Sequence, residues 1–218
     1  TVGRGTHYLA QSGSCERAGG PVIRALLLVA LLAGGHSGCA GTALVDGTRA
    51  KGGTVIRIKA KQAAKKGLPA IGFSVDVAGT AMSGKPFPED DVYLTLSGPP
   101  GGPLLMNVTG YTAAGHGSDT LDAQVRAVFD QPWNAPFALD GTGTLSLSGA
   151  ARSARTFFTG KAPFKTRWCA ALVPDPAGKG QGLLVAFGDA AGADTKADCA
   201  VIAGHAHLAP LIRTFKVE

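Results

Sequence analysis

The chain has 218 residues, with 21 Lys and Arg against 15 Asp and Glu, and a formal net charge of +6. This mild basic excess is smaller than nucleic-acid-binding proteins usually carry, so we expect no nucleic-acid partner. The 32 glycines, the 6% of aromatic residues and the 17% of charged residues favour short strands joined by tight turns over long surface helices.

An apolar run near the N-terminus has the layout of an export signal. Val22-Ile23-Arg24 supplies the basic start, and Ala25 to Ala33 supplies the apolar segment. A membrane-spanning helix needs about 20 apolar residues, so this run predicts a signal peptide over residues 22–39 that is removed. Residues 1–21 form a polar, Gly-rich tract that we expect to be disordered, and we hypothesise that translation begins at Val22.

The small residues Ser37 and Gly38 directly precede Cys39. This motif resembles the lipobox of bacterial lipoproteins, although His36 stands where that family usually has an apolar residue. The resemblance implies that Cys39 is lipidated, becomes the first residue of the mature chain and anchors it to an envelope membrane, facing the periplasm or the exterior. The alternative is an ordinary signal cleaved at Gly35-His36-Ser37 or at Gly41-Thr42-Ala43, which would give a secreted protein.

Removing the leader leaves 18 basic and 14 acidic residues, and enough chain for one domain with its own core. We expect residues 40–53 to form a polar tether and residues 54–218 to form the domain. The segment between Asp46 and Asp76 has no acidic residue. Within it, residues 55–61 alternate, so that Ile56, Ile58 and Ala60 share one face of a strand while Arg57, Lys59 and Lys61 share the other.

Two interpretations of these cations remain open, and Lys65 and Lys66 belong to the same basic segment. They can form a solvated face that discourages pairing at a sheet edge. They can also attract an anionic lipid surface, where each cation contributes about 1 kcal/mol.

Further along the chain, alternation and turn residues predict a series of strands and only one helical turn, at residues 62–67. Residues 78–91 and 113–119 are expected loops. The spacing of Leu121, Val125 and Phe129 satisfies both a helix and a strand, and we favour a strand because Val and Phe crowd its end. The remaining expected strands are residues 71–77, 92–97, 104–111, 142–147, 155–159, 161–169, 183–187, 199–203 and 211–217.

This pattern predicts an all-β fold. We expect one antiparallel β-sandwich, immunoglobulin-like or related, with about nine to ten short strands and no long helix; a barrel is the alternative.

Two cysteines remain in the domain once Cys39 is assigned to lipid and Cys15 to the N-terminal extension. In an exported chain, Cys169 and Cys199 are therefore predicted to form a disulfide. The alternative is a pair of buried, unpaired thiols.

Few residues suggest chemistry. His205 and His207 are two positions apart, so on a strand both would point to one side, and with His116 they would offer three metal ligands. The alternative is a pair of surface histidines. The run from His116 to Asp119 contains the residue types of a catalytic triad, but adjacent loop residues cannot hold that geometry. We expect Glu89-Asp90-Asp91 to be solvated and Asn107 to be unmodified.

The sequence contains no motif typical of hydrolases, nucleotide-binding proteins or metalloproteases. We therefore expect a non-enzymatic, envelope-anchored lipoprotein whose β-domain binds a ligand or serves a structure, with no cofactor and with membrane lipid, through Cys39, as its partner. The alternative is a periplasmic metal-handling protein or metal-dependent enzyme that uses His116, His205 and His207.

Overall fold

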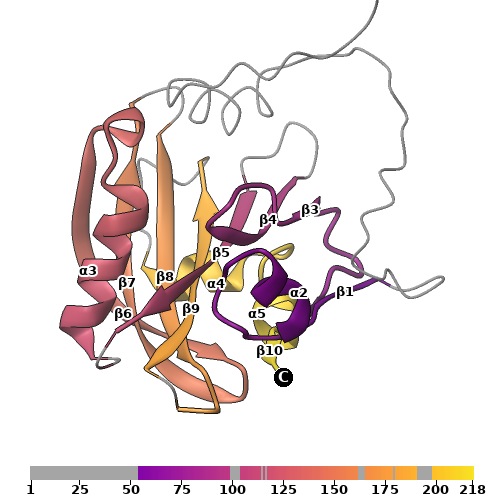
Figure 1. Ribbon diagram of the computed structural model, residues 1–218. Helices are drawn as coiled ribbons and strands as arrows, with labels where there is room; N and C mark the ends of the chain where they lie inside the picture. The colour runs from indigo at the N-terminus through magenta and orange to yellow at the C-terminus, as the bar shows by residue number, and fades with distance from the viewer. Residues whose placement is uncertain are drawn as a thin grey trace, which may run out of the picture.

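The computed structural model describes residues 54–98, 104–113, 115, 117–161, 165–178, 180–190 and 198–218. The leader, Cys39, the tether and His116 lie outside these residues. The described part is mostly β, with ten strands in two antiparallel sheets, and this confirms the predicted fold class (Figure 1).

The smaller sheet has the order β1-β2-β10. Its strands are β1 (Val55–Ile58), β2 (Phe73–Asp76) and β10 (Lys216–Val217). The larger sheet has the order β3-β4-β5-β9-β8-β7-β6, and it is open, with β3 and β6 at its two edges. Its strands are β3 (Ser83–Pro86), β4 (Val92–Gly98), β5 (Leu104–Thr112), β6 (Phe137–Leu147), β7 (Ala150–Thr159), β8 (Thr166–Pro174) and β9 (Gln181–Asp189).

The larger sheet buries both of its faces. On β8, Cys169, Ala171 and Val173 belong to one apolar cluster, and Trp168, Ala170 and Leu172 belong to the other. Because successive side chains of a strand point to opposite faces, such a central strand is apolar along its whole length. Burial on both faces is the reason that residues 169–173 and 183–187 are almost continuously hydrophobic.

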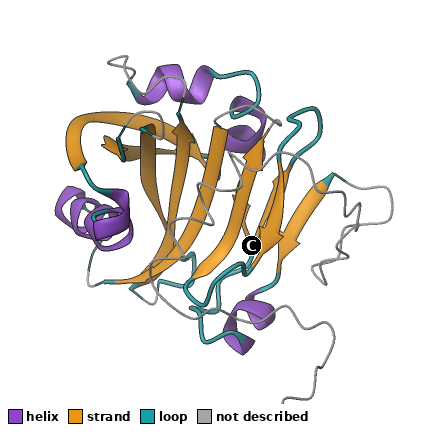
Figure 2. Ribbon diagram, turned by 90° about the horizontal axis from the view of Figure 1, so that it is seen from above, coloured by secondary structure: helices purple, strands orange, loops and turns teal. Residues whose placement is uncertain are grey.

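The two faces are covered by different elements. The smaller sheet, helix α4 (Cys199–Gly204) and helix α5 (Ala209–Thr214) contribute Phe73, Ile202 and Leu211, respectively, to the first cluster. Helix α3 (Ser118–Phe129) covers the other face with Leu121 and Val125. Figure 1 shows α3 on the side of β7 and β8, with β1 and helix α2 (Ala60–Lys65) at the opposite end of the molecule. Figure 2, from above, shows helices placed around the strands rather than within a sheet.

The strand prediction for residues 121–130 is wrong, because these residues form most of α3. A spacing of four fits both periods, and the end charges favour the helix. Asp119 lies in its first turn and Arg126 in its last turn, which matches the direction of the helix dipole. The helix also supplies the apolar cover that the second face of the larger sheet needs, and it contradicts the expectation of no long helix.

The predicted strands at residues 199–203 and 211–217 are also mainly helical. The Asp198 side chain accepts a hydrogen bond of 3.0 Å from the Val201 amide, which caps the start of α4. Pro210 lies in the first turn of α5, where its missing amide costs nothing. Only Lys216 and Val217 of the last segment form a strand.

Two corrections concern shorter segments. The expected loop at residues 78–91 contains strand β3. Pro132–Asn134 forms a 3₁₀ turn, η1, before β6. Within the described residues, no helix has the length and apolar character needed to cross a membrane.

Candidate membrane-facing surface

The first strand of the domain separates apolar from charged side chains as predicted. Ile58 is fully buried and Ile56 packs against the same apolar cluster, whereas Arg57 is exposed on the opposite face. The Arg57 Nε lies 2.9 Å from Oε1 of Glu218, and the two side chains are 53% and 34% exposed. An ion pair this exposed contributes little stability, so Arg57 remains available to solvent anions.

The expected strand over residues 55–61 is too long, because the chain turns into α2 after Ile58. The Lys59 amide donates a hydrogen bond of 2.9 Å to Oε1 of Gln62, which satisfies a backbone group at the start of the helix. Ala60 is therefore helical and does not extend the inner face of the strand. Lys61 is on the helix as well, so the predicted row of three cations on one strand face is wrong.

Helix α2 gathers the lysines in another way. Lys61 and Lys65 are four residues apart, so they lie on the same side of the helix. Ala63 is fully buried and fixes the opposite side against the core. Lys66 follows at the C-cap, and all of these lysines are exposed.

A further cation reaches this surface from the end of the chain. Ser74 of β2 is opposite Arg57 of β1 on one side and opposite Lys216 of β10 on the other. Residues in register share a face of the sheet, and two strand spacings separate Arg57 from Lys216 by about 10 Å. The sequence offered one signal for Lys216, its alternation with Phe215 and Val217, but the strand partner could not be deduced from it.

We call these six residues the basic surface: Arg57, Lys59, Lys61, Lys65, Lys66 and Lys216. Among the described residues, none of the five lysines has an ion-pair partner. Besides Glu218, which pairs with Arg57, the strands of the smaller sheet contain one acid, Asp76, opposite Val55. A hydrogen bond from Thr54, and then one from the Ala78 amide, lower the pKa of Asp76, so it stays charged at neutral pH. The surface therefore carries an excess of cations that an external anion can neutralise.

The predicted histidine site lacks the strand on which it was based. His205 is the C-cap residue of α4, and His207 lies in the turn that follows, with ring centroids 5.8 Å apart. The Nδ1 atom of His205 accepts a hydrogen bond of 3.3 Å from the His207 amide, so that atom is occupied. Within the part of the chain that the structure describes, no three His, Cys, Asp or Glu side chains gather as a metal site.

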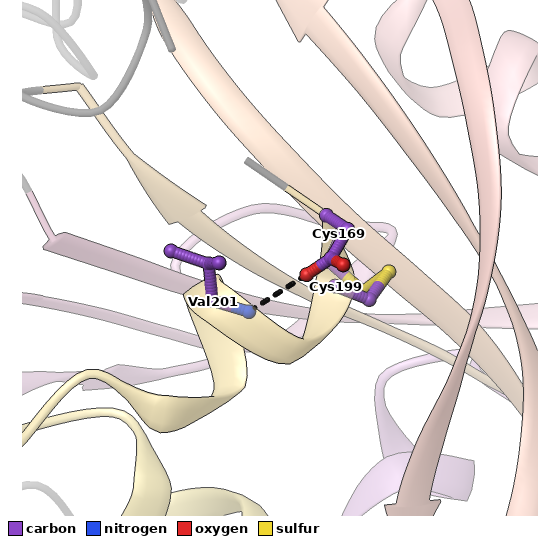
Figure 3. The surroundings of a disulfide bond; sticks show 4 residues. Cys169, Cys199 and Val201 are labelled. Carbon is purple, nitrogen blue, oxygen red and sulfur yellow. Dashed lines mark hydrogen bonds between the residues drawn. A yellow bond between two sulfur atoms is a disulfide. The ribbon is translucent and has the colours of Figure 1, made fainter. Parts of the chain in front are cut away.

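The predicted disulfide is present. The sulfur atoms of Cys169 and Cys199 are 2.03 Å apart, and both residues are almost completely buried. Figure 3 shows the bond joining α4 to strand β8, next to the hydrogen bond of the Val201 amide that begins the helix. The bond therefore fixes α4 to the inner face of the larger sheet.

A small cavity of about 180 Å³ lies between α3 and the ends of β7 and β8, lined by Leu121, Arg152 and Leu172 among others. The Nε atom of Arg152 is buried there without a hydrogen-bond partner. None of the site residues predicted from the sequence lines this cavity.

Comparison with known proteins shows a structural likeness and no sequence match. No known family matches the chain, and no curated protein matches it. Among solved structures, the cyanobacterial PsbP (CyanoP) from Synechocystis sp. PCC 6803 is similar, with a TM-score of 0.47 and 10% identity. The match covers 85% of this chain and 100% of that one. At this level of similarity, no function is transferred.

Proposed function

We propose that this chain is a lipid-anchored protein of the bacterial envelope whose domain lies against an anionic membrane through the basic surface. In this proposal Cys39 carries the lipid, and the domain is a non-enzymatic module that binds a ligand or serves a structure. The observation that carries the proposal is the position of the cations. Five of the six lie on or directly beside β1 and α2, which follow the expected tether, and Lys216 of β10 joins them from the end of the chain.

The strength of the attraction follows from the number of unpaired cations. Each cation near an anionic leaflet contributes about 1 kcal/mol, so the five unpaired lysines are sufficient to orient a tethered domain. Arg57 contributes less, because Glu218 competes for it. Because these charges are exposed and screened by salt, the interaction should weaken steeply as ionic strength rises.

The disulfide supports the extracytoplasmic part of the proposal. Disulfides persist in oxidising compartments and are rare in the bacterial cytosol. Cys169 and Cys199 are joined and buried in this fold, which suits a domain that folds after export.

Vesicle binding tests the basic surface. We would use the chain with Cys39→Ser, which has no acceptor for lipid, and vesicles of phosphatidylglycerol or of phosphatidylcholine. We expect binding to phosphatidylglycerol alone, with an affinity that falls as salt rises. The double change Lys61→Gln and Lys65→Gln should weaken binding by roughly thirtyfold, since two cations near the lipid are removed.

A matched control removes two positive charges outside the basic surface. Arg126 is on α3, Lys161 follows β7, and both are exposed. Figure 1 shows α3 and β7 at the end of the molecule opposite β1 and α2. Changing Arg126 and Lys161 to Gln should leave vesicle binding close to that of the unchanged chain. Equal loss in the two double variants would mean that only net charge matters, and binding without dependence on lipid charge would remove the basic surface from the proposal.

A further inference from the structure

The two edges of the larger sheet are built differently. Strand β3 has four residues, and two of them, Lys85 and Pro86, are residue types that hinder pairing with another chain. Strand β6 has eleven residues, Phe137–Leu147, and contains no Lys, Arg or Pro. Its only charged residue, Asp140, lies at a bulge and is paired with Arg167. One edge is therefore protected against strand addition, whereas on the other the residues beyond the bulge, 141–147, carry none of these protecting features.

Strand β6 is paired on one side only. Strand β7 runs along its whole length, and within the described residues no other strand pairs with it. Its inner face is covered, since Leu145 and Leu147 are buried and Gly143 packs against Cys199 of α4. On its outer face Thr142, Thr144 and Ser146 are exposed. The backbone groups that point away from β7 thus lie in a row beside small, uncharged side chains.

We propose that the β6 edge pairs in antiparallel fashion with β6 of a second copy of this chain. The residues of the strand are complementary to themselves. In a register centred on Thr144, that residue faces Thr144 of the second copy, and Thr142 faces Ser146 of the second copy. Cross-strand Thr and Ser pairs are favourable, and this register places no like charges opposite each other.

The backbone of β6 is already ordered in the single chain. The ladder to β7 fixes the backbone of β6, and α4, which the disulfide attaches to β8, packs on its inner face. A strand that is already ordered loses little entropy when it pairs.

The symmetry of the proposed pair determines where the two α4 helices lie. A two-fold axis perpendicular to the sheet reverses the strand direction, as antiparallel pairing requires, and keeps both α4 helices on the same face of the joined sheet. Val201 of α4, which is 63% exposed, therefore belongs to the same face of the joined sheet in both copies.

Sedimentation equilibrium of the full chain with Cys39→Ser tests the proposal without association through lipid. We expect a monomer–dimer equilibrium, and Thr144→Lys should weaken it by roughly fivefold, because two like charges then face each other about 5 Å apart. Ser153 is the neighbour of Thr144 on β7 and is exposed on the same face. Ser153→Lys is the control, since its two copies would be about 14 Å apart and screened by salt.

A charge swap makes the test specific to this edge. Thr144→Glu alone should also weaken the dimer, and an equal mixture of the Thr144→Lys and Thr144→Glu chains should restore it through opposite charges. A chain that remains monomeric at all concentrations would overturn the proposal. A dimer that Thr144→Lys leaves unchanged, or that Ser153→Lys weakens equally, would also overturn it.

Discussion

Gly143 of β6 lies directly against Cys199 of α4: a Cβ added at Gly143 would be 3.0 Å from the Cys199 Cβ and 3.3 Å from its Sγ. The neighbour cannot easily move, because the disulfide holds Cys199 to β8. The absence of a side chain at one position thus allows the helix to rest on the edge strand.

Gly143→Val should destabilise the domain by about 1–3 kcal/mol, the usual cost of forcing a larger side chain into a packed contact. Urea unfolding followed by circular dichroism measures the change. Thr142→Val is the control, because Thr142 is exposed and its replacement should shift the free energy of unfolding by less than about 0.5 kcal/mol. Equal stability of the two variants would contradict the close contact.

Removing the disulfide should cost about 3–4 kcal/mol in the free energy of unfolding. This figure follows from closing a loop with a sequence separation of 30 residues, in the chain-entropy account. The double change Cys169→Ala and Cys199→Ala, compared with the parent chain in urea, gives the value. Thiol titration of the denatured parent chain before and after reduction checks the pairing, and two reactive thiols in these positions before reduction would show that the bond is absent.

The ion pair between Arg155 and Asp122 should stabilise the docking of α3 on β7. The Nη2 atom of Arg155 lies 3.0 Å from Oδ2 of Asp122, and its Nε contacts the other carboxylate oxygen. Both side chains are partly buried, at 22% and 31% exposure. Asp122→Asn should therefore cost about 1 kcal/mol, the upper end of the range for exposed pairs.

The comparison variant is Asp130→Asn, which removes the more exposed pair with Arg126 on the same helix. That change should cost at most about 0.5 kcal/mol. If both variants lose the same free energy in urea, the Arg155 pair contributes nothing beyond a surface contact.

Stability should fall at alkaline pH because of Tyr111. Burial raises the pKa of Tyr111 to about 12, and nearby Arg152 offsets this only in part. An unfolded tyrosine has a pKa of about 10, so the unfolded state loses its proton first. The stability that neutral Tyr111 provides is complete below about pH 10 and is lost as the pH rises to about 12.

Urea midpoints measured across this pH range test the effect. Tyr111→Phe keeps the ring and should make the alkaline loss of stability shallower than in the parent chain. The pKa of Tyr93 is also raised, mainly by burial, so part of the loss should remain. Parallel curves for the two chains would show that Tyr111 does not ionise differently in the folded and unfolded states.

Alternation and short apolar runs together predicted several strands of the domain. The expected strand at residues 71–77 contains β2, and those at residues 92–97, 104–111 and 183–187 correspond to β4, β5 and β9. The Cys169–Cys199 pair followed from cysteine number and export, without any knowledge of the fold. These features depend on local pattern or on composition, which a sequence displays directly.

A helical turn was predicted where α2 lies, but α3, α4 and α5 were missed because the contacts that decide them are tertiary. Leu121, Val125 and Phe129 are four residues apart, a spacing that suits either a helix or a strand. They form α3 because the second face of the larger sheet needs an apolar cover, and the local sequence does not show this. Likewise, the pairing of Lys216 with β2 brings the end of the chain beside Arg57. Strand order across a sheet is not encoded in any local pattern, so this member of the basic surface could not be predicted.

Incorporation of radiolabelled palmitate in a bacterial host tests whether Cys39 anchors the domain to a membrane. If Cys39 carries the lipid, the full chain takes up label and sediments with membranes, whereas Cys39→Ser takes up none and is released on cell fractionation. Equal labelling of both chains, or label in neither, would contradict the lipid anchor.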